Sequence, residues 1–425
     1  MSSQTTSPSR RRVLQAGGAA AAASVLAAPA VRASSANTIK IGYVAPASGP
    51  LALFSESDPF VLAQAKKLFA NGIKVGGTTY AVEIIYKDTQ SDSNRASDVA
   101  SELILNDNVD MLVGASTPAT TVPLADQAEL NGVPCVTNDT PWQPWFFSRK
   151  GDPTKGFQWT YHYFWGLEDI IAVYTSMWSQ IATNKLVGAL WPNDPDGNAW
   201  SDAQHGFPPA LAQKGYGLDD LGRFPLPADN FTSFITDFKN KGAEIVTGVI
   251  PPPDFANFWN QSGQQGYKPK IVTVAKATEF PEAIAGFGGR AAGLSVDTWW
   301  HPTFPFHSSL TGQSCAEIAQ AYHAFSGKTW TMPLGYRYSL IEMIKDVFSR
   351  AASTDPNDVV AAIRATNLNS VVGTINFNKG PVPNVSKTPL AGGQWKQGAG
   401  GVELVVIENS LEPSIPVGGK LAPIA

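Results

Sequence analysis

The chain has little of the chemistry that metal sites, disulfides and most catalytic sites require. Its 425 residues include two cysteines and five histidines. The histidines are scattered without the paired spacing typical of metal ligands; they are His162, His205, His301, His307 and His323. The Gly-x-Ser-x-Gly motif of hydrolases is absent. The sequence therefore predicts no metal site, no cofactor and no catalytic constellation.

Charge is also sparse. Charged residues make up 16% of the chain and hydrophobic residues 43%, which is too apolar for a disordered protein. The length allows more than one hydrophobic core, so two domains are expected. The net charge of -4 and the lack of Lys/Arg blocks beyond the N-terminus argue against a nucleic acid partner.

The first 36 residues have the pattern of an export signal. Three arginines, Arg10 to Arg12, precede an apolar run of small residues, 16–28, and then several small-x-small cleavage sites. The arrangement resembles the twin-arginine signal of bacteria, with a general secretory signal as the alternative. A membrane anchor is disfavoured because the apolar run is too short to span a bilayer. We expect cleavage near residues 30–36 and release into the periplasm.

The two cysteines lie in different contexts. Cys135 lies in a buried-strand pattern, whereas Cys315 opens a helix-like segment. A disulfide could persist in an exported chain. Two unpaired, small apolar side chains are the favoured interpretation, and a bridge stays open as the alternative.

Short apolar strands alternate with amphipathic helices from Asn37 onward, which predicts an α/β fold with parallel sheets covered on both faces. One predicted helix illustrates the spacing of three and four between apolar positions; its apolar face carries Ala96, Val99, Ala100, Leu103 and Ile104. The same rhythm resumes at 185–191 as a second unit, which includes a helix near 201–214. Further helices are predicted at 315–325, 334–352 and 355–365.

Four segments, in this order, resemble a known family. They are IKIGYVAPASGPLALF (39–54), LVGASTPATTVPLADQAELNGVPCVTND (112–139), GYRYSLIEMIKDVFSRA (335–351) and VVAAIRATNLNSVVGTINFNKG (359–380). The family is that of the type I periplasmic solute-binding proteins of ABC importers, in particular its leucine/isoleucine/valine-binding branch. The resemblance covers nearly the whole chain after the signal.

The resemblance implies two Rossmann-like lobes that close like a Venus flytrap and are joined by three crossovers. The N-terminal lobe would contain residues 37–158 and 300–372. The C-terminal lobe would contain residues 159–299 and 373–425. Ligand would lie in the cleft where the carboxyl ends of the parallel strands meet, which is also where ligands bind to such sheets on general grounds.

The strongest candidate for binding chemistry is the loop at Ser116 and Thr117. These residues stand at the N-cap of a predicted helix whose first position is Pro118, so free amides and the positive dipole end would face an anion. The alternative is that both hydroxyls only cap the helix. Ser48 lies in the segment that resembles the family's opening loop. The resemblance also implies a second ligand loop, which carries the polar residues Asn138, Asp139 and Thr140.

Aromatic and acidic residues complete the predicted site. Asp196 and Asp254 match the second-lobe loops of the resemblance, and one residue of the pair Trp299 and Trp300 is expected to face the cleft because neighbours on a strand alternate faces. Aromatic side chains stack well on planar rings; the other aromatic candidates are Phe54, Trp142 and Trp191.

The predicted function is capture of a small organic acid by lobe closure, for import through the permease subunits of an ABC transporter. An aromatic carboxylate is the favoured ligand, and a branched-chain or other amino acid is second. A monomer is expected. The alternatives are an exported Rossmann-like enzyme and the ligand-sensing subunit of a receptor.

Overall fold

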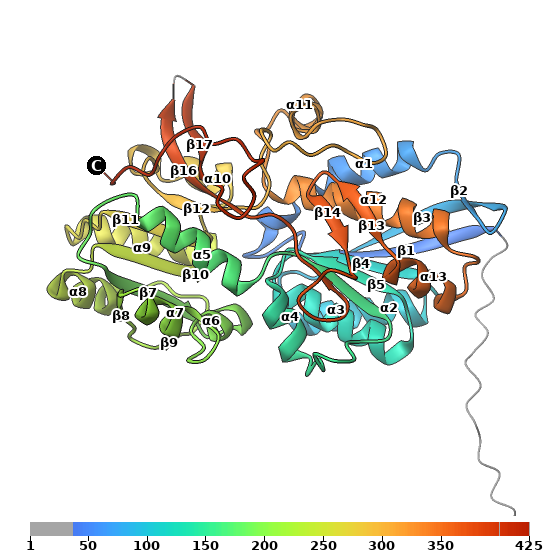
Figure 1. Cartoon of the computed structure of the whole chain (residues 1–425), viewed down its shortest axis with the longest axis horizontal. Coiled ribbons are helices and arrows are strands. Elements are labelled where there is room, and N and C mark those ends of the chain that lie inside the picture. The colour runs from blue at the N-terminus through green and yellow to red at the C-terminus, as the bar shows by residue number, and fades with distance from the viewer. Residues whose placement is uncertain (1–36, 399, 425) are drawn as a thin grey trace, which may run out of the picture. The chain divides into compact units, whose positions relative to one another are not determined.

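The computed structural model describes residues 37–398 and 400–424 (Figure 1). The predicted export signal, residues 1–36, lies outside this range. Within the described residues, no helix combines the length and apolarity that crossing a membrane would take.

The first sheet has seven strands and is parallel except at one edge. Its order is β15 (Val385–Ser386), β6 (Thr160–Tyr163), β5 (Cys135–Asn138), β4 (Met111–Ala115), β1 (Thr38–Ala45), β3 (Thr78–Asp88) and β2 (Ile73–Val75). The strand β2 pairs antiparallel with β3. The central strands β4 and β5 are buried at every position, as expected for parallel strands covered on both faces.

Helices cover both faces of this sheet. One face packs on α2 (Ser93–Leu105) and α3 (Pro118–Asn131), and all five apolar positions predicted for α2 are buried. The helices α1 (Asp58–Leu68) and α12 (Pro333–Arg350) pack on one another and belong to the other core. The remaining elements of this part are η1 (Ala52–Ser55), α4 (Trp142–Ser148), α11 (Cys315–Ser326), α13 (Pro356–Arg364) and the hairpin β13 (Asn367–Ser370) and β14 (Gly373–Asn376).

The second sheet has eight strands and mixes parallel and antiparallel pairs. Its order is β17 (Gly401–Glu408), β16 (Ala391–Gly398), β12 (Ser295–Thr298), β11 (Ile271–Lys276), β10 (Ile245–Ile250), β7 (Leu186–Pro192) and β8 (Gly217–Asp219), with β9 (Arg223–Phe224) beside β7. The hairpin β16–β17 pairs antiparallel with β12. A hairpin from the end of the chain therefore closes one edge of this sheet.

The helices of the second part connect its parallel strands. They are α5 (Leu167–Trp178), α6 (Pro195–Trp200), α7 (Phe207–Gln213), α8 (Thr232–Lys241), α9 (Pro252–Gln264), α10 (Pro281–Ala285) and the turn η2 (Gly288–Arg290). The helix predicted near 201–214 is present but shorter, because α7 begins only at Phe207. Gly206 is its N-cap, and Pro208 and Pro209 fit only its first turn.

The chain passes between the two sheets three times. The passages lie between β6 and β7, between β12 and β15, and between β15 and β16. The expected lobe ranges need correction at two of them. The strand β6 pairs with β5, and β15 pairs with β6, so residues 160–163 and 385–386 belong to the first sheet and not to the second.

The cysteines follow the favoured interpretation. Both Cys135 and Cys315 are buried and free. The Cys315 thiol lies 3.4 Å from the Val371 carbonyl oxygen. Neither cysteine therefore contributes a covalent link to the fold.

Candidate functional site

The carboxyl ends of parallel strands from both sheets surround one cavity of about 30 Å³. It is lined by Phe54, Thr117, Asp139, Pro141, Phe164, Trp165, Asp196, Trp200, Val249, Ala275, Lys276, Glu279 and Trp299. Most of these residues lie in or just after the end of a strand, whereas Phe54 lies in η1 and Asp196 and Trp200 lie in α6. A volume of this size holds only a few atoms. The cavity therefore lies where an α/β sheet positions a ligand, but in this conformation it admits only a compact group.

Three residues beside the cavity have a backbone that side chains normally disfavour. Ser116 has a φ of 122°, Asp139 of 64° and Lys276 of 63°. Each follows or ends a parallel strand, β4, β5 and β11 respectively. Positive φ in a residue with a Cβ costs on the order of 1–3 kcal/mol and is concentrated at functional sites. The strain at three strand ends supports this cavity as the functional site.

The first-sheet side of the cavity rests on a buried arginine. Arg337, on α12, lies 3.2 Å from Asp58 Oδ1 and 3.4 Å from Asp139 Oδ2, and its Nη2 donates to the Phe54 carbonyl at 2.9 Å. Tyr86 also donates to Asp58 at 2.6 Å. One guanidinium thus fixes both Phe54 and Asp139, which come from distant parts of the chain.

Asp139 is the carboxyl group that this arrangement leaves open to a ligand. Burial raises its pKa to about 7, although the Arg337 charge acts in the opposite direction. Both of its oxygens are buried and, within the described residues, have no hydrogen-bond partner. A donor placed in the cavity would satisfy them.

The second-sheet side carries one ammonium group between carboxylates. Lys276 Nζ lies 2.5 Å from Asp196 and 3.3 Å from Asp194. Burial disfavours its charge, but the two carboxylates outweigh this and raise the pKa of Lys276. Burial also raises the pKa of Asp196 to about 6. The positive charge of Lys276 is therefore largely neutralised before any ligand arrives.

Glu279 lies on the same side. Its Oε1 accepts from the Lys276 backbone N–H at 2.7 Å, whereas its Oε2 is buried without a partner among the described residues. Burial, followed by the charge of Asp297, raises the pKa of Glu279 well above its usual value, and Asp139 adds to the effect. Asp139 and Glu279 both line the cavity, so the two carboxyl groups face a common space.

Aromatic rings form most of the remaining wall. Trp299 packs on Tyr336 and Phe164, with centroid distances of 5.1 and 5.4 Å. The indole N–H groups of Trp165 and Trp200 are buried and have no partner in the described part of the chain. The wall is apolar and suited to stacking, and it contains two donors ready for an acceptor.

Two contacts outside the cavity hold the first-sheet and second-sheet sides together. Phe54 packs edge-on against Phe280 at 4.9 Å. Lys328, which follows α11, lies 2.5 Å from Glu56 beside η1 and 3.2 Å from Glu282 on α10. We call Lys328, Glu56 and Glu282 the clasp.

Five of the thirteen predicted ligand residues line the cavity. They are Phe54, Thr117, Asp139, Asp196 and Trp299. Of the tryptophan pair, Trp299 lines it, whereas the Trp300 indole N–H donates to the Val371 carbonyl at 3.1 Å. Neighbouring side chains on a strand point to opposite faces, and the two indoles accordingly lie in different surroundings, as predicted.

Three predicted residues lie directly behind the wall. Thr140 donates to the Ser116 carbonyl at 2.8 Å, and Asn138 donates to the Tyr163 hydroxyl at 2.8 Å. The Ser116 hydroxyl is buried and has no partner among the described residues. The prediction that these hydroxyls cap α3 is wrong in detail, because Thr117 is the N-cap residue but its side chain makes no cap hydrogen bond.

Four other predictions do not reach the cavity. Ser48 bonds to Asp88 at 2.6 Å on an exposed loop, and the Trp142 indole donates to Glu168 at 3.2 Å. Trp191 packs in the second core against Phe207, with a centroid distance of 5.6 Å.

Asp254 is the fourth predicted residue that does not reach the cavity. It lies in the first turn of α9, where its Oδ1 accepts from the Ala228 backbone N–H at 2.5 Å. Three prolines precede or begin this helix, and the carboxylate binds the backbone at Ala228, 26 residues earlier in the chain, instead of facing the cavity.

The sequence reasoning missed the residues that give the cavity its charge and much of its aromatic wall. Lys276 and Glu279 follow the buried run of β11, and a lysine directly after such a run is an available signal. Trp165 follows β6, a strand that was not predicted. Trp200, the last residue of α6, is not among the predicted residues.

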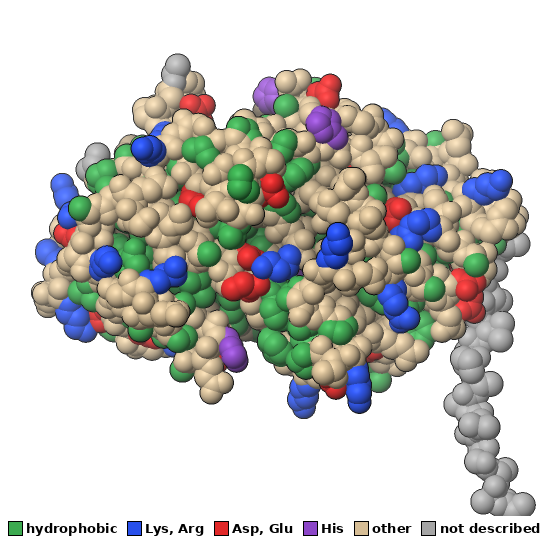
Figure 2. Space-filling view, in the orientation of Figure 1, with side chains coloured by type: hydrophobic (Ala, Val, Ile, Leu, Met, Phe, Trp, Pro, Cys, Tyr) green, Lys and Arg blue, Asp and Glu red, His purple; other side chains and the backbone are tan. Residues whose placement is uncertain are grey.

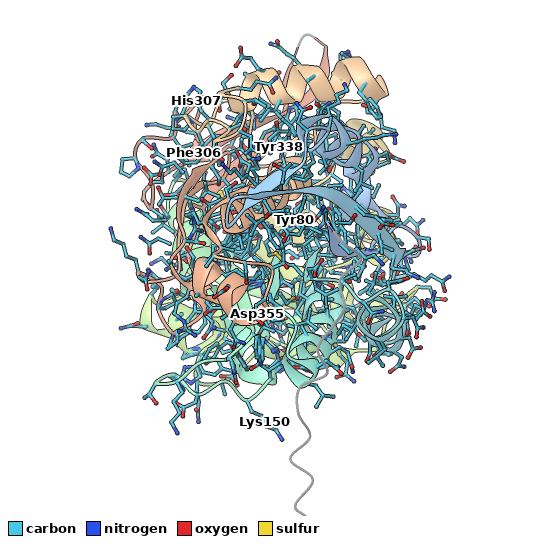
Figure 3. The ribbon with its side chains drawn as sticks, turned by 90° about the vertical axis from the view of Figure 1, so that its right-hand side faces the viewer. Tyr80, Lys150, Phe306, His307, Tyr338 and Asp355 are labelled. Carbon is cyan, nitrogen blue, oxygen red and sulfur yellow. The ribbon has the colours of Figure 1, made fainter. Side chains whose placement is uncertain are left out.

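A second hollow, of about 680 Å³, lies along the crossover segments. Its lining includes Phe306 and His307, which lie next to one another in Figure 3, together with Lys387 and Thr388. His307 and the neighbouring Pro305 are exposed. This hollow is larger than the strand-end cavity but lacks its buried unpaired groups, so the smaller cavity is the better candidate site.

Comparisons with known proteins agree with this geometry. The family described as "Periplasmic binding protein" matches residues 38–399. The Leu/Ile/Val-binding protein homolog 6 of Brucella abortus is 25% identical over 228 residues, which are 52% of this chain and 53% of that protein. The match thus spans about half the length of this curated relative.

Two solved structures share the fold. One is the branched-chain amino acid transporter substrate binding protein of Streptococcus pneumoniae with isoleucine, at 15% identity and a TM-score of 0.68, covering 88% of this chain and all of that one. The other is a solute binding protein of an ABC transporter from Rhodopseudomonas palustris with 3,4-dihydroxybenzoic acid. It has 18% identity and a TM-score of 0.70, and the match covers 87% of this chain and 96% of that one.

Proposed function

Because the chain belongs to the periplasmic binding protein family, we propose that it captures a small organic solute between its two sheets and delivers it to an ABC permease. The observation that carries this proposal is the strand-end cavity, which is walled from both sheets and contains buried polar groups without partners. Such groups cost free energy in the free protein and are satisfied when a ligand arrives.

Capture works through a shift of population. A solute that contacts both sides of the cavity binds the closed arrangement better than any open one, so it favours closure. A ligand larger than the cavity of about 30 Å³ requires the walls of the cavity to separate. The contacts of Phe54 with Phe280 and of the clasp would break and reform in each cycle.

The first candidate ligand is an aromatic carboxylate, and a branched-chain or other amino acid is the second. The indoles of Trp165, Trp200 and Trp299 support a planar body, since each ring contact adds about 0.5–1.5 kcal/mol beyond burial. The N-terminus of α3 at Thr117 supports an acceptor group at one end. The two solved relatives hold ligands of these two kinds.

The location that follows is the periplasm, reached by the predicted signal. The twin-arginine route can be tested by replacing Arg10, Arg11 and Arg12 with lysines, a change that keeps the charge. Retention in the cytoplasm is expected for that route, and unchanged export would indicate the general secretory route. Acidic and basic side chains are interspersed over the face shown in Figure 2.

The experiment is a thermal-shift screen of amino acids, amides and aromatic acids, followed by solution scattering with each hit. A rise in melting temperature and a smaller radius of gyration are expected for a ligand. Mass spectrometry of the recovered solute separates this proposal from the enzyme alternative. Recovery of a chemically changed solute would refute the binding function.

A further inference from the structure

The strand β3 leaves one long edge of the first sheet without a neighbouring strand. Its residues 81–88 pair with β1 on one side. On the other side β2 reaches only residues 78–80. The last of these, Tyr80, lies on the side of the molecule that faces the viewer in Figure 3. Among the described residues, no strand lies beside β3 on this edge from Ala81 to Asp88.

The backbone of this edge is directed outward at alternate residues. The Ala81 N–H donates to the Asn37 carbonyl at 2.9 Å, on the side of β1. Backbone polar groups alternate between the two sides of a strand, so those of Val82, Ile84 and Tyr86 point away from β1. Such a row of N–H and C=O groups at an open edge is a template for pairing with another strand.

The other edge strands of the two sheets are protected. Natural proteins keep such edges short or cover them. The strands β15 and β8 have only two and three residues. The strand β17 is partly covered by the end of the chain, because the Gly418 N–H donates to the Val406 carbonyl at 2.9 Å. The open edge of β3 is longer and has neither protection, which indicates a partner strand.

Two charged side chains on β3 restrict which strand can pair with it. Charges on an edge strand disfavour pairing in most registers. Glu83 is exposed, and Lys87 lies 3.2 Å from Glu102 on α2. Glu83 and Lys87 point to the same face of the sheet, because side chains alternate along a strand with a period of two. The strand therefore presents a negative and a positive charge on one face, on either side of Ile85.

These charges select one arrangement of two β3 strands. In an antiparallel pair centred on Ile85, Glu83 of each copy lies opposite Lys87 of the other. Opposite charges directly across a pair stabilise it, and like charges destabilise it. The same register puts the outward-directed Ile84 and Tyr86 in hydrogen-bonded positions, so the backbone and the charges agree. A pair centred on Ile84 would place Glu83 opposite Ile85 and lose the charge match.

An apolar groove of about 550 Å³ lies beside the same edge, on the face that α1 covers. Leu62 and Phe69 of α1 and Val82 and Ile84 of β3 are among its lining residues. In the arrangement described above, the other copy brings its own Ile84 and Tyr86 to this face, next to the groove. Apolar side chains of both copies are then removed from water, which favours association.

We propose that the protein forms a symmetric dimer in which the β3 strands of two copies pair antiparallel around Ile85, so that their first sheets become one continuous sheet. The same surface of each copy forms this interface, so the assembly closes on two copies and does not extend into a fibre. None of the residues that line the strand-end cavity lies on β3, so each copy keeps its own capture site. A dimer replaces the monomer expected from the sequence.

The first test measures the mass of the exported, processed protein by light scattering and sedimentation at increasing concentration. We expect the mass of two chains at high concentration. The mass of one chain at every concentration up to millimolar would overturn the proposal. Because the capture site is separate from β3, that result would leave the proposed function intact.

Charge variants test the pairing itself. Glu83→Lys and Lys87→Glu are each expected to weaken dimerisation about tenfold, because both cross-strand pairs then hold like charges. The double variant restores opposite charges and is expected to regain most of the affinity. Glu403→Lys, at an exposed position of the edge strand β17, is the matched control and is expected to leave the dimer unchanged. Unweakened dimers in both single variants would overturn the assignment to β3.

A cysteine at the symmetry axis tests the register. Directly opposite residues of a non-hydrogen-bonded antiparallel pair have Cα atoms about 4.5 Å apart, which a disulfide can span. Ile85→Cys is therefore expected to give a covalent dimer on mild oxidation, whereas Glu83→Cys, which lies opposite Lys87 of the other copy, is not. Cys135 and Cys315 are buried and do not compete. With urea unfolding confirming that both variants are folded, covalent dimers in both or in neither would overturn the pairing around Ile85.

Discussion

Arg337 offers the sharpest test of the forces that hold the cavity in shape. Its side chain is fully buried and lies between Asp58 and Asp139, with two of its nitrogens donating to the Phe54 carbonyl. Arg337→Met keeps much of the volume and removes the charge. Two carboxyl groups then remain buried without their cation, and the Phe54 carbonyl loses its donors.

Breaking a buried ion pair by removing one partner costs about 3–5 kcal/mol. Part of this cost can be avoided, since protonation of Asp58 and Asp139 lowers the charge that stays buried. We therefore expect a loss near 3 kcal/mol in the free energy of unfolding at neutral pH, with a smaller loss at mildly acidic pH, since burial already raises the pKa of both groups.

The assay is urea unfolding followed by tryptophan fluorescence, with the triple variant Arg337→Met, Asp58→Asn, Asp139→Asn as the matched control. The triple variant has no buried charge at this place, and we expect it to regain most of the lost stability. Two results would refute the reasoning: a loss below about 1 kcal/mol in the single variant, or a triple variant less stable than the single one.

Three further predictions follow from the same contacts. Trp300→Phe is expected to lower the free energy of unfolding by about 1–3 kcal/mol, because the hydrogen bond to the Val371 carbonyl is lost. Trp299→Phe is expected mainly to weaken ligand binding. Equal effects of the two variants on ligand binding would contradict this prediction. Lys328→Met should raise the ligand dissociation rate about two- to threefold at low salt and hardly at all at high salt, as measured by stopped flow, because surface ion pairs are weak and screened. The melting temperature should rise as pH falls from about 8 to 6.5, since buried Asp139, with its pKa of about 7, takes up a proton that the unfolded chain does not; a monotonic fall over this interval would contradict it.

The repeating part of the fold was predictable because it is local. The helix 93–105 buries all five apolar residues that its spacing indicates, and the tryptophan pair separates as strand alternation requires. The strand β6 was not found, because its residues include His162 and polar neighbours that do not form an apolar run. Its burial comes from pairing with β5 and from the stacking of His162 on Trp145.

The candidate site was only partly predictable for a related reason. Thr117 and Asp139 follow strands whose patterns are clear, so the sequence indicates their position. Lys276 acquires its role only from partners far away along the chain, Asp194 and Asp196, and Glu279 lines the cavity together with the still more distant Asp139. A loop's register across prolines, as at Asp254, is set by tertiary packing and not by local spacing.

The order in which the chain supplies its strands affects synthesis and quality control. The first sheet receives its edge strand β15 from residues 385–386, and the second receives β16 and β17 from residues 391–408. A chain still on the ribosome, or one cut before β15, leaves the edges of β6 and β12 open to pairing with other chains. Both sheets are therefore completed almost together, by residues 385–408, so a product truncated before them is a substrate for proteases and aggregation and not a half-functional protein.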